Sequence, residues 1–367
     1  MRVLRLTVSQ LRRLQHVELN PAPGLNLITG ENGAGKTSLL EALHLMAYGR
    51  SFRGRVRDGL VRTGAEAVEV FVEWEEASTR VRRAGLRHGG QNWTGRLDGE
   101  NVQQLGDLCA ALAVVSFEPG SHALVTGSGE PRRRFMDWGL FHVEHGFLQL
   151  WRRYARALKQ RNALLKSGAG GSQLNAWDNE LAEAGEPLTE RRAQYLEQLH
   201  ERLAVTAGEL VPSLGAATLE FHPGWRRHEL PLADALLVAR ERDRQAGHTS
   251  VGPHRADWKV SYTACANGEA LSRGQAKLTA LACILSQAED YALRRGEWPV
   301  IALDDLASEL DRHHQRRVLE RLLASGAQVF ITGTEAPAAL ENLPAHPHLF
   351  HVEQGILTLV SQAHPTG

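Results

Sequence analysis

The chain has 367 residues, of which 42 are Lys or Arg and 42 are Asp or Glu, so its formal net charge is zero. A chain of this length, with 43% hydrophobic and 23% charged residues, can bury a sizeable core and divide into two lobes. Because the net charge is zero, a surface that binds anions must be a local patch. The three cysteines form no C-x-x-C pair, which argues against a disulfide framework and against a thiolate metal site.

The N-terminal residues alternate as a strand does and contain no continuous apolar region of the kind that a signal peptide needs. No run of residues has the length and apolar character required to cross a bilayer. The 17 histidines share no metal motif such as H-E-x-x-H. We therefore expect a cytoplasmic protein with no membrane partner, whose histidines serve packing or lie on the surface.

Residues 1–30 read as strands, and the last of them, at Leu25–Ile28, is followed by a glycine-rich loop and a helix that ends at Tyr48. The loop matches G-x-x-x-x-G-K-[ST], whose backbone N–H groups and helix N-terminus bind phosphate. Lys36 is expected to reach the terminal phosphates of ATP, and the Thr37 hydroxyl is expected to ligate Mg²⁺. An ordinary glycine turn at a helix start is the alternative. The predicted nucleotide-binding residues here are Gly30, Glu31, Asn32, Gly33, Ala34, Gly35, Lys36, Thr37 and Ser38.

Beyond this helix lies an arginine-dense loop, and then strand patterns at 68–74, 79–83 and 112–116, with a tight hairpin turn at Asp98-Gly99. After Gly127 the pattern becomes helical, and residues 131–166 carry nine Lys or Arg against two acids. We place a mostly helical lobe at 122–245. It is inserted into an α/β nucleotide-binding lobe made from both chain ends, 1–121 and 246–367.

The C-terminal part contains an apolar strand at 299–303 that ends in Asp304-Asp305. A carboxylate at this position can coordinate Mg²⁺ together with Thr37, and the neighbouring Asp305 can polarise an attacking water molecule. We therefore assign Thr37 and Asp304 to the metal, and we expect Asp304, Asp305 and Lys36 to be catalytic residues.

Ser272 belongs to the segment Leu271–Gln275, which precedes a helix expected at 276–295. An N-cap serine is the simpler interpretation of this segment. The order of P-loop, Ser-x-Gly-Gln segment, carboxylate strand and Ser-Glu-Leu-Asp segment resembles the ATP-binding-cassette superfamily, in which the Ser-x-Gly-Gln signature caps the nucleotide held by a second subunit. That resemblance implies that Ser272, Gly274, Gln275 and Asp311 contact ATP across a dimer, and that Ser272 is a fourth catalytic residue.

Over nearly its whole length the chain resembles the RecF family of bacterial recombination mediators, which are related to the heads of SMC proteins. The segments that carry the resemblance are Gly30–Thr37, Ser51–Arg53, Arg132–Asp137, Lys159–Asn162, Gly252–Arg255, Leu271–Gln275 and Leu303–Asp311. The resemblance implies an ABC-type, SMC-head-like α/β ATPase lobe and a slow ATPase that forms an ATP-dependent homodimer. It also implies binding to DNA gaps and junctions, and partnership with RecR and RecO in loading RecA onto strands coated by SSB.

Four positions depart from these patterns. Asp305 stands where many cassette ATPases have Glu, and Thr332-Gly333-Thr334 stands where a switch histidine is usual, so that a threonine is a candidate for the γ-phosphate contact. No Q-loop glutamine is evident near 115–119, and Ala256 separates Gly-Pro-His-Arg from Asp257. The adenine contacts are not assigned, with Arg12 and Arg13 as candidates.

Two basic regions are candidates for DNA phosphates: the helical window 131–166 and the loop arginines 50, 53, 55, 57 and 62. Both regions could instead pair with internal acids or form a solvated surface. The sequence shows no recognition-helix or zinc-finger pattern, so we expect sequence-independent binding. Two further functions were weighed. A transporter cassette is disfavoured by the long interval between Lys36 and Ser272. An SMC-like tether is disfavoured by expected helix breaks at 168–172, 185–187 and 212.

Overall fold

The computed structural model describes residues 1–54, 59–89, 92–168, 171–265, 270–344 and 347–361. The chain forms two compact units, one made of Met1–Ser121 with Gln287–Gly367 and the other of His122–Ser286. The second unit starts where the helical lobe is expected and continues past residue 245. It does so because strand β10 (Asp257–Tyr262) pairs antiparallel with β9 (Ala217–His222). Each unit is described by itself below.

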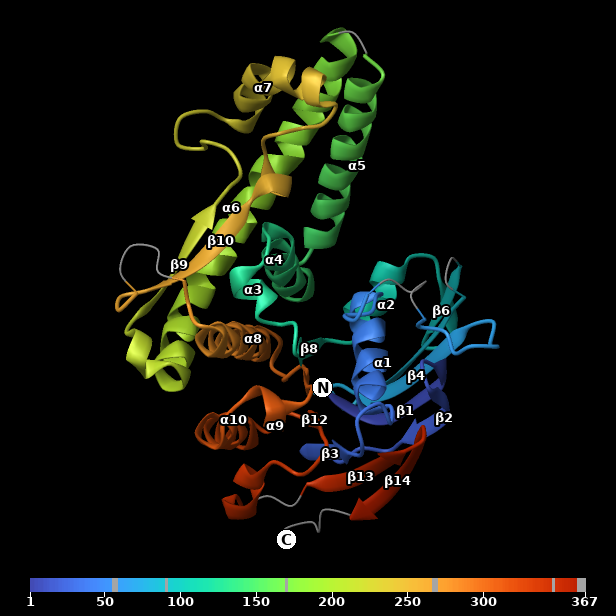
Figure 1. The fold of residues 1–367 in the computed structure, drawn as a ribbon. Helices are drawn as coiled ribbons and strands as arrows, with labels where there is room; N and C mark the ends of the chain where they lie inside the picture. The colour runs from blue at the N-terminus through green and yellow to red at the C-terminus, as the bar shows by residue number, and fades with distance from the viewer. Residues whose placement is uncertain (55–58, 90–91, 169–170, 266–269, 345–346, 362–367) are drawn as a thin grey trace. The chain divides into compact units, whose positions relative to one another are not determined.

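The first unit contains two six-stranded sheets (Figure 1). One sheet is antiparallel and has the order β2-β1-β4-β5-β6-β7. Its strands are β1 (Arg2–Leu11), β2 (Leu14–Leu19), β4 (Val68–Glu75), β5 (Val81–His88), β6 (Trp93–Leu97) and β7 (Glu100–Val102). Asp98 and Gly99 form the expected tight turn between β6 and β7, with φ values of 52° and 90°.

The other sheet has the order β14-β13-β3-β12-β11-β8 and is parallel from β13 to β8. Its strands are β3 (Leu25–Thr29), β8 (Val114–Phe117), β11 (Val300–Leu303), β12 (Val329–Gly333), β13 (His348–Glu353) and β14 (Ile356–Ser361). Every residue of β11 and β12 is buried, as expected for parallel strands covered on both faces. The carboxyl ends of β3, β11 and β12 therefore meet at one edge of this sheet.

Helix α1 (Lys36–Tyr48) packs against β1 and β4 of the antiparallel sheet and against β8 and β12 of the parallel sheet (Figure 1). Eleven of its 13 residues are buried, so the helix forms the centre of the first unit's hydrophobic core. This burial holds the N-terminus of α1 at the edge of the parallel sheet. Further helices of this unit are α2 (Leu105–Ala111), α9 (Leu306–Glu309), α10 (Arg312–Ser325) and the 3-10 helix η4 (Ala338–Asn342).

The second unit is mostly helical. Its helices are α3 (Ala123–Thr126), α4 (Gly129–Val143), α5 (Phe147–Lys166), α6 (Gly171–Leu210), α7 (Leu232–Ala246), the 3-10 turns η1 (Pro212–Leu214) and η2 (Pro253–Arg255), and the first part of α8 (Arg273–Arg295). Residues 169–170 of the first expected helix break lie outside the described residues, and the chain does leave the α-helix before Pro212.

The break expected at Gly185–Pro187 was wrong, because α6 runs through it as a helix of 40 residues. Gly185 is where α6 meets its neighbours. A Cβ at this position would lie 2.4 Å from Leu232 Cδ2 and 3.1 Å from Tyr154 Cε2, side chains of α7 and α5. The glycine thus serves close helix packing, and this packing outweighs the local propensity against a helix at Gly and Pro.

Candidate nucleotide site

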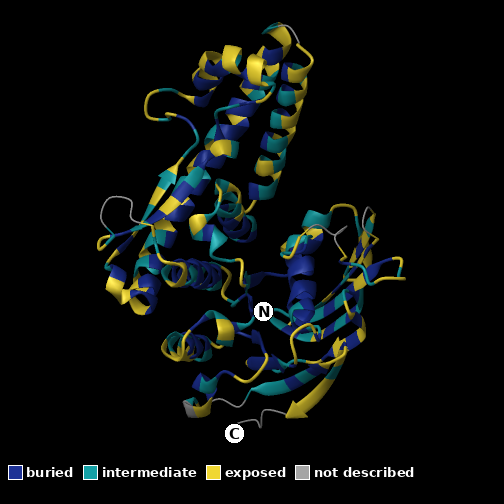
Figure 2. Ribbon diagram, viewed as in Figure 1, coloured by how far each residue is buried: buried dark blue, intermediate teal, exposed yellow. Residues whose placement is uncertain are grey.

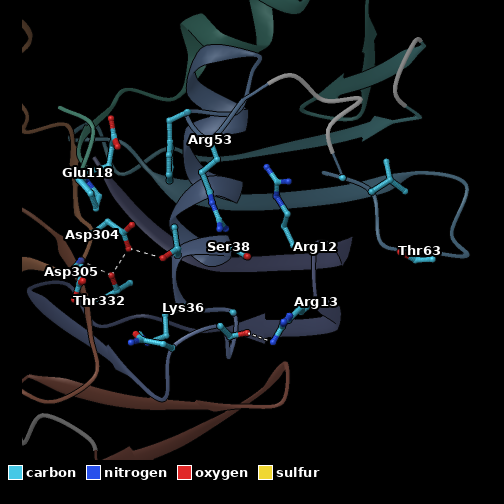
Figure 3. Close-up of a pocket in the computed structure, with 18 residues that line it drawn as sticks. Arg12, Arg13, Lys36, Ser38, Arg53, Thr63, Glu118, Asp304, Asp305 and Thr332 are labelled. Atoms are coloured by element: carbon cyan, nitrogen blue, oxygen red, sulfur yellow. Dashed lines mark hydrogen bonds between the residues drawn. The ribbon is translucent and has the colours of Figure 1, made fainter. Parts of the chain in front are cut away.

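A cavity of about 690 Å³ lies in the first unit at the edge of the parallel sheet (Figure 3). It is lined by residues from the P-loop, the N-terminal strands, the loop after α1, the segment after β8, and the ends of β11 and β12. These residues are Arg12, Arg13, Asn32, Gly33, Gly35, Lys36, Thr37, Ser38, Phe52, Arg53, Gly59, Val61, Thr63, Glu118, Pro119, Asp304, Asp305 and Thr332. The cavity therefore gathers the predicted P-loop and carboxylate residues in one place.

The P-loop between β3 and α1 depends on its glycines. Gly30 and Gly35 have φ values of 148° and 122°, which favour glycine over other residues. A Cβ on Gly30 would lie 2.2 Å from the Val352 carbonyl oxygen, and one on Gly35 would lie 2.6 Å from Leu14 Cδ2. No side chain caps α1, and Lys36, Thr37 and Ser38 of its first turn line the cavity, which therefore lies at the positive end of the helix dipole. This arrangement suits a bound phosphate.

The Lys36 side chain folds back over the loop that precedes it. Its ammonium donates to the carbonyl oxygens of Gly30 at 2.7 Å and Glu31 at 2.8 Å. Burial lowers the pKa of Lys36, while the charges of Asp305 and Asp304 act in the opposite direction. The cation thus lies inside the cavity within the field of both carboxylates, as a group that binds the terminal phosphates must.

The predicted metal ligands meet at the end of β11. Asp304 Oδ1 accepts hydrogen bonds from Thr37 Oγ1 at 2.9 Å and from Thr332 Oγ1 at 2.6 Å. Burial raises the pKa of Asp304, although both hydroxyls and Arg53 oppose the rise. A hydroxyl and a carboxylate are the hard oxygen donors that Mg²⁺ prefers, so this pair fits the ion.

Thr332 was predicted only as a substitute for the switch histidine, and its position shows a more definite role. Its hydroxyl donates to Asp304 and accepts from the N–H of Asp305 at 2.9 Å. Asp305 itself has φ of 53°, so the chain turns sharply between β11 and α9. Thr332 therefore holds the two aspartates in a defined arrangement, while its contact with a γ-phosphate stays a prediction.

A buried acid on α1, Glu41, organises the wall of the cavity and was missed by the sequence reasoning. It is fully buried, and it accepts hydrogen bonds from Arg12 Nε at 3.1 Å and Arg12 Nη2 at 2.7 Å. The Ser51 hydroxyl also donates to it, and Arg53 lies at 3.8 Å. Two arginines that line the cavity are thereby oriented by one carboxylate. In the sequence, the indication of this role is that Glu41 stands among apolar residues at the centre of a helix.

Two further residues, Arg13 and Glu118, lie in neighbouring parts of this wall. Arg13, a candidate adenine contact, donates from Nη1 to the Gly33 carbonyl at 3.1 Å and so supports the P-loop. After β8, at the place of the missing Q-loop glutamine, Glu118 lines the cavity and accepts from the Gly120 N–H at 2.6 Å. Glu118 thus contributes a carboxylate to this wall, and the Q-loop contact stays open.

The signature residues lie in the second unit and begin α8. Ser272 and Gln275 form a reciprocal capping box, in which Gln275 N–H donates to Ser272 Oγ at 3.2 Å and Ser272 N–H donates to Gln275 Oε1 at 2.8 Å. Ser272 and Gly274 are exposed, and nothing lies within 4 Å of a Cβ built on Gly274. The N-cap interpretation is thus correct for this chain by itself, and contact with a second subunit's ATP stays a prediction.

Asp311 has a similar local role at the start of α10. Its carboxylate accepts from the His314 N–H at 3.0 Å and lies 2.7 Å from His314 Nδ1. These bonds, above all the one from the backbone, lower the pKa of Asp311. The residue is exposed, so its predicted contact across a dimer also stays a prediction.

The basic residues of window 131–166 fall into two groups. Five of them bind groups of their own unit: Arg132 pairs with Asp257, Arg133 donates to the Ala256 carbonyl, Arg134 pairs with Glu130, Arg153 pairs with Glu180 and Glu183, and Arg161 pairs with Asp178 and Asp243. The second group contains Arg156, Lys159 and Lys166, together with Arg152, which also has an interaction within the protein. Among the loop arginines, Arg55 and Arg57 lie outside the described residues. Within the described chain, no helix is long and apolar enough to span a membrane.

Comparison with known proteins places the chain among related sequences. The model of the RecF/RecN/SMC N terminal domain matches residues 2–358. The chain is 70% identical to the DNA replication and repair protein RecF of Stenotrophomonas maltophilia, over 98% of this chain and 100% of that protein. It is 36% identical to the protein of the same name from Shewanella baltica, again over 98% of this chain.

Solved structures agree with this relationship. A structure described as the recombination mediator protein RecF-ATP in the RecFOR pathway matches 98% of each chain at 26% identity, with a TM-score of 0.84. An SMC head bound to the C-winged helix domain of ScpA matches at 15% identity with a TM-score of 0.61, which bears on the fold alone. The expected ABC-type, SMC-head-like α/β fold is confirmed, and the chain belongs to the RecF family.

Proposed function

We propose that this chain is an ATP-dependent DNA-binding protein of recombinational repair and replication-fork recovery. One observation carries the proposal: the Asp304 carboxylate, at the end of a buried strand, meets the P-loop Thr37 hydroxyl at 2.9 Å beside the Lys36 ammonium. This arrangement suits a nucleoside triphosphate with Mg²⁺. The names of the relatives, which refer to DNA replication, repair and the RecFOR pathway, support the biological setting.

The chemistry is a slow hydrolysis of ATP to ADP and phosphate. The P-loop N–H groups and Lys36 bind the phosphates, and Thr37 with Asp304 would hold Mg²⁺, which supplies charge neutralisation at the β- and γ-phosphates. Asp305, turned toward the cavity by its left-handed backbone, polarises the attacking water. Its carboxylate is one methylene shorter than that of glutamate, which is consistent with slow turnover and with ATP acting as a switch.

ATP binding favours a homodimer, because the exposed start of α8 on one copy completes the phosphate site of the other. Ser272, Gly274 and Gln275 provide donors and a helix dipole, and Asp311 adds a further contact. Nucleotide shifts the population toward this closed dimer, which clamps gapped or junction DNA without reading its sequence. Together with RecR and RecO, the clamp helps to load RecA, and hydrolysis reopens it.

The test combines sedimentation velocity with binding to a gapped duplex, in ATP with Mg²⁺ and in ADP with Mg²⁺. The expected result is a dimer and tight DNA binding in ATP, and a monomer with weak binding in ADP. A monomer in both nucleotides, or DNA affinity that does not depend on the nucleotide, would contradict the proposal. A transporter subunit, the alternative function, predicts no gain in DNA affinity with ATP.

A further inference from the structure

Helix α5 is unusual in its charge. Its 20 residues include six cations, Arg152, Arg153, Arg156, Lys159, Arg161 and Lys166, and no acid. One side of the helix is apolar and buried, with Tyr154, Ala157 and Leu165 each at most 4% exposed. This side packs against α6 and α7. In Figure 2, buried and exposed positions alternate along α5 as expected for a helix with one covered side.

Two of the six cations neutralise acids of the same unit. Arg161 is fully buried and binds Asp178 at 2.5 Å and Asp243 at 2.8 Å. Arg153 binds Glu180 at 2.7 Å and Glu183 at 2.7 Å on α6. Arg152 also has an interaction within the protein.

Three further cations form a stripe, defined here as Arg156, Lys159 and Lys166. Their spacings of three and seven residues place them on one face of the helix, opposite the buried side. All three are exposed. Arg156 also lies near enough to Glu180 to help lower the pKa of that carboxyl, behind the larger effect of its bond with Arg153. The stripe runs about 15 Å along the helix axis.

The chemistry of the stripe favours a polyanion with evenly spaced charges. A length of about 15 Å corresponds to about four phosphates along one strand of a duplex. A membrane surface is disfavoured, because the apolar side of α5 is already buried against other helices. The other residues on this face are Leu148, Gln149, Ala155, Gln160 and Ala163. A protein partner is disfavoured, because this set has one large apolar side chain, at the start of the helix, and no aromatic residue to form the centre of a protein interface.

We propose that the α5 stripe is the surface on which this protein binds the phosphate backbone of DNA. This inference rests on the proposed function and assigns it a location in the second unit. Flexible Lys and Arg side chains that contact phosphates displace counterions and read no bases, so binding at the stripe is independent of sequence and steeply dependent on salt.

The experiment measures the affinity of the full chain, in ATP with Mg²⁺, for a gapped duplex between 50 and 200 mM salt by fluorescence anisotropy. The stripe variant carries Arg156→Gln, Lys159→Gln and Lys166→Gln, and glutamine preserves helix propensity. Loss of three phosphate contacts lowers the slope of log affinity against log salt by about 2.7. The unsubstituted chain then loses about 40-fold more affinity over this salt range than the variant does.

The control variant removes the same charge from exposed cations elsewhere, with Arg226→Gln, Lys259→Gln and Arg316→Gln. It should keep the slope of the unsubstituted chain, and so should a charge-preserving variant with Arg156→Lys, Lys159→Arg and Lys166→Arg. Each single glutamine substitution should lower the slope by about 1 even if the triple variant folds poorly. ATP affinity and circular dichroism check that the variants are folded.

The possible failures are distinct. If the unsubstituted chain binds the gapped duplex in an ATP-dependent manner and the folded stripe variant keeps the same salt slope, the assignment of the stripe is wrong and the proposed function stands. Equal losses in the stripe and control variants also overturn the assignment, because they would show an effect of net charge alone. If ATP gives the unsubstituted chain no gain in DNA affinity, the proposed function itself fails.

Discussion

Ser272 has two proposed roles, and two substitutions separate them. Its hydroxyl accepts the Gln275 N–H at 3.2 Å and caps α8. Ser272→Ala removes that acceptor at a cost of about 1 kcal/mol, which speeds amide exchange in the first turn of α8 about fivefold. Ser272→Asp keeps an acceptor at the N-cap, where Asp is as favourable as Ser and its charge suits the helix dipole. The first turn of the aspartate variant should therefore exchange as slowly as that of the unsubstituted chain.

Dimerisation should rank the same two variants in the opposite order. Alanine removes one donor from each of two composite sites, worth about 2 kcal/mol in total, or about 30-fold in dimer affinity. Aspartate places a negative charge near the γ-phosphate, and at ~4 Å and an effective dielectric constant of ~20 each repulsion costs about 4 kcal/mol. With two sites in a dimer, the aspartate variant should lose far more than a thousandfold in dimer affinity.

Hydrogen exchange of the chain without nucleotide, followed by sedimentation velocity with ATP and Mg²⁺, tests both rankings. The expected pattern is fast exchange with partial dimerisation for Ser272→Ala, and slow exchange with no dimer for Ser272→Asp. Ser272→Thr, which keeps a hydroxyl, should resemble the unsubstituted chain in both assays. If the aspartate variant dimerises as well as the unsubstituted chain, the serine does not face a phosphate and the composite site is refuted.

Four other substitutions test separate parts of the molecule. Lys36→Ala should abolish ATP binding in calorimetry and with it the ATP-induced dimer, because the cation within the P-loop is lost. Asp305→Asn should bind ATP but release no phosphate, leaving a stable dimer on DNA in a gel shift. Burial raises the pKa of Asp304 in the folded state above its ordinary value of 3.8. Between the ordinary pKa and the raised pKa, the folded state holds more protons than the unfolded state, so the free energy of unfolding falls as pH rises through this range. Asp304→Asn should therefore be more stable than the unsubstituted chain at pH 7 in thermal unfolding, while it loses Mg²⁺-dependent hydrolysis. Arg161→Ala leaves Asp178 and Asp243 buried without their shared cation and should cost about 3–5 kcal/mol in urea unfolding, unlike the exposed cations of the same helix.

The nucleotide site could be predicted from the sequence because its parts are local. The P-loop is a continuous segment in which strand, glycines and helix start specify one another, and Asp304 follows directly on an apolar strand. The roles of Glu41 and Thr332 could not be predicted in the same way. Each is a single polar residue whose partners come from distant segments, such as Arg12 for Glu41 and Asp304 for Thr332.

The basic window 131–166 shows a second limit of prediction from local sequence. Arg132 and Arg161 lie in the same basic window as Lys159, yet both pair with acids that lie far along the chain. Asp257 is 125 residues from Arg132, and Asp243 is 82 residues from Arg161. Helical periodicity alone separates the buried face of α5 from the exposed face, but which arginines are neutralised depends on the elements that pack against it. The charge available to a partner is therefore a property of the fold.

The proposed ATP site has two parts, the P-loop with its carboxylates and the signature segment, and the fold builds them differently. Thr37, Asp304 and Thr332 come from segments up to 295 residues apart along the chain and meet because parallel strands β3, β11 and β12 bring their carboxyl ends to one edge. All residues of these strands except Thr29 are buried, so the P-loop and the carboxylates are held by the core of the sheet. The signature is a helix start in the other unit, stabilised by its own capping box and exposed. Such a segment is held by its own capping box without ATP. In the proposed mechanism a second copy brings this segment to the phosphate, so that ATP binding and dimer closure are separate steps controlled by different residues.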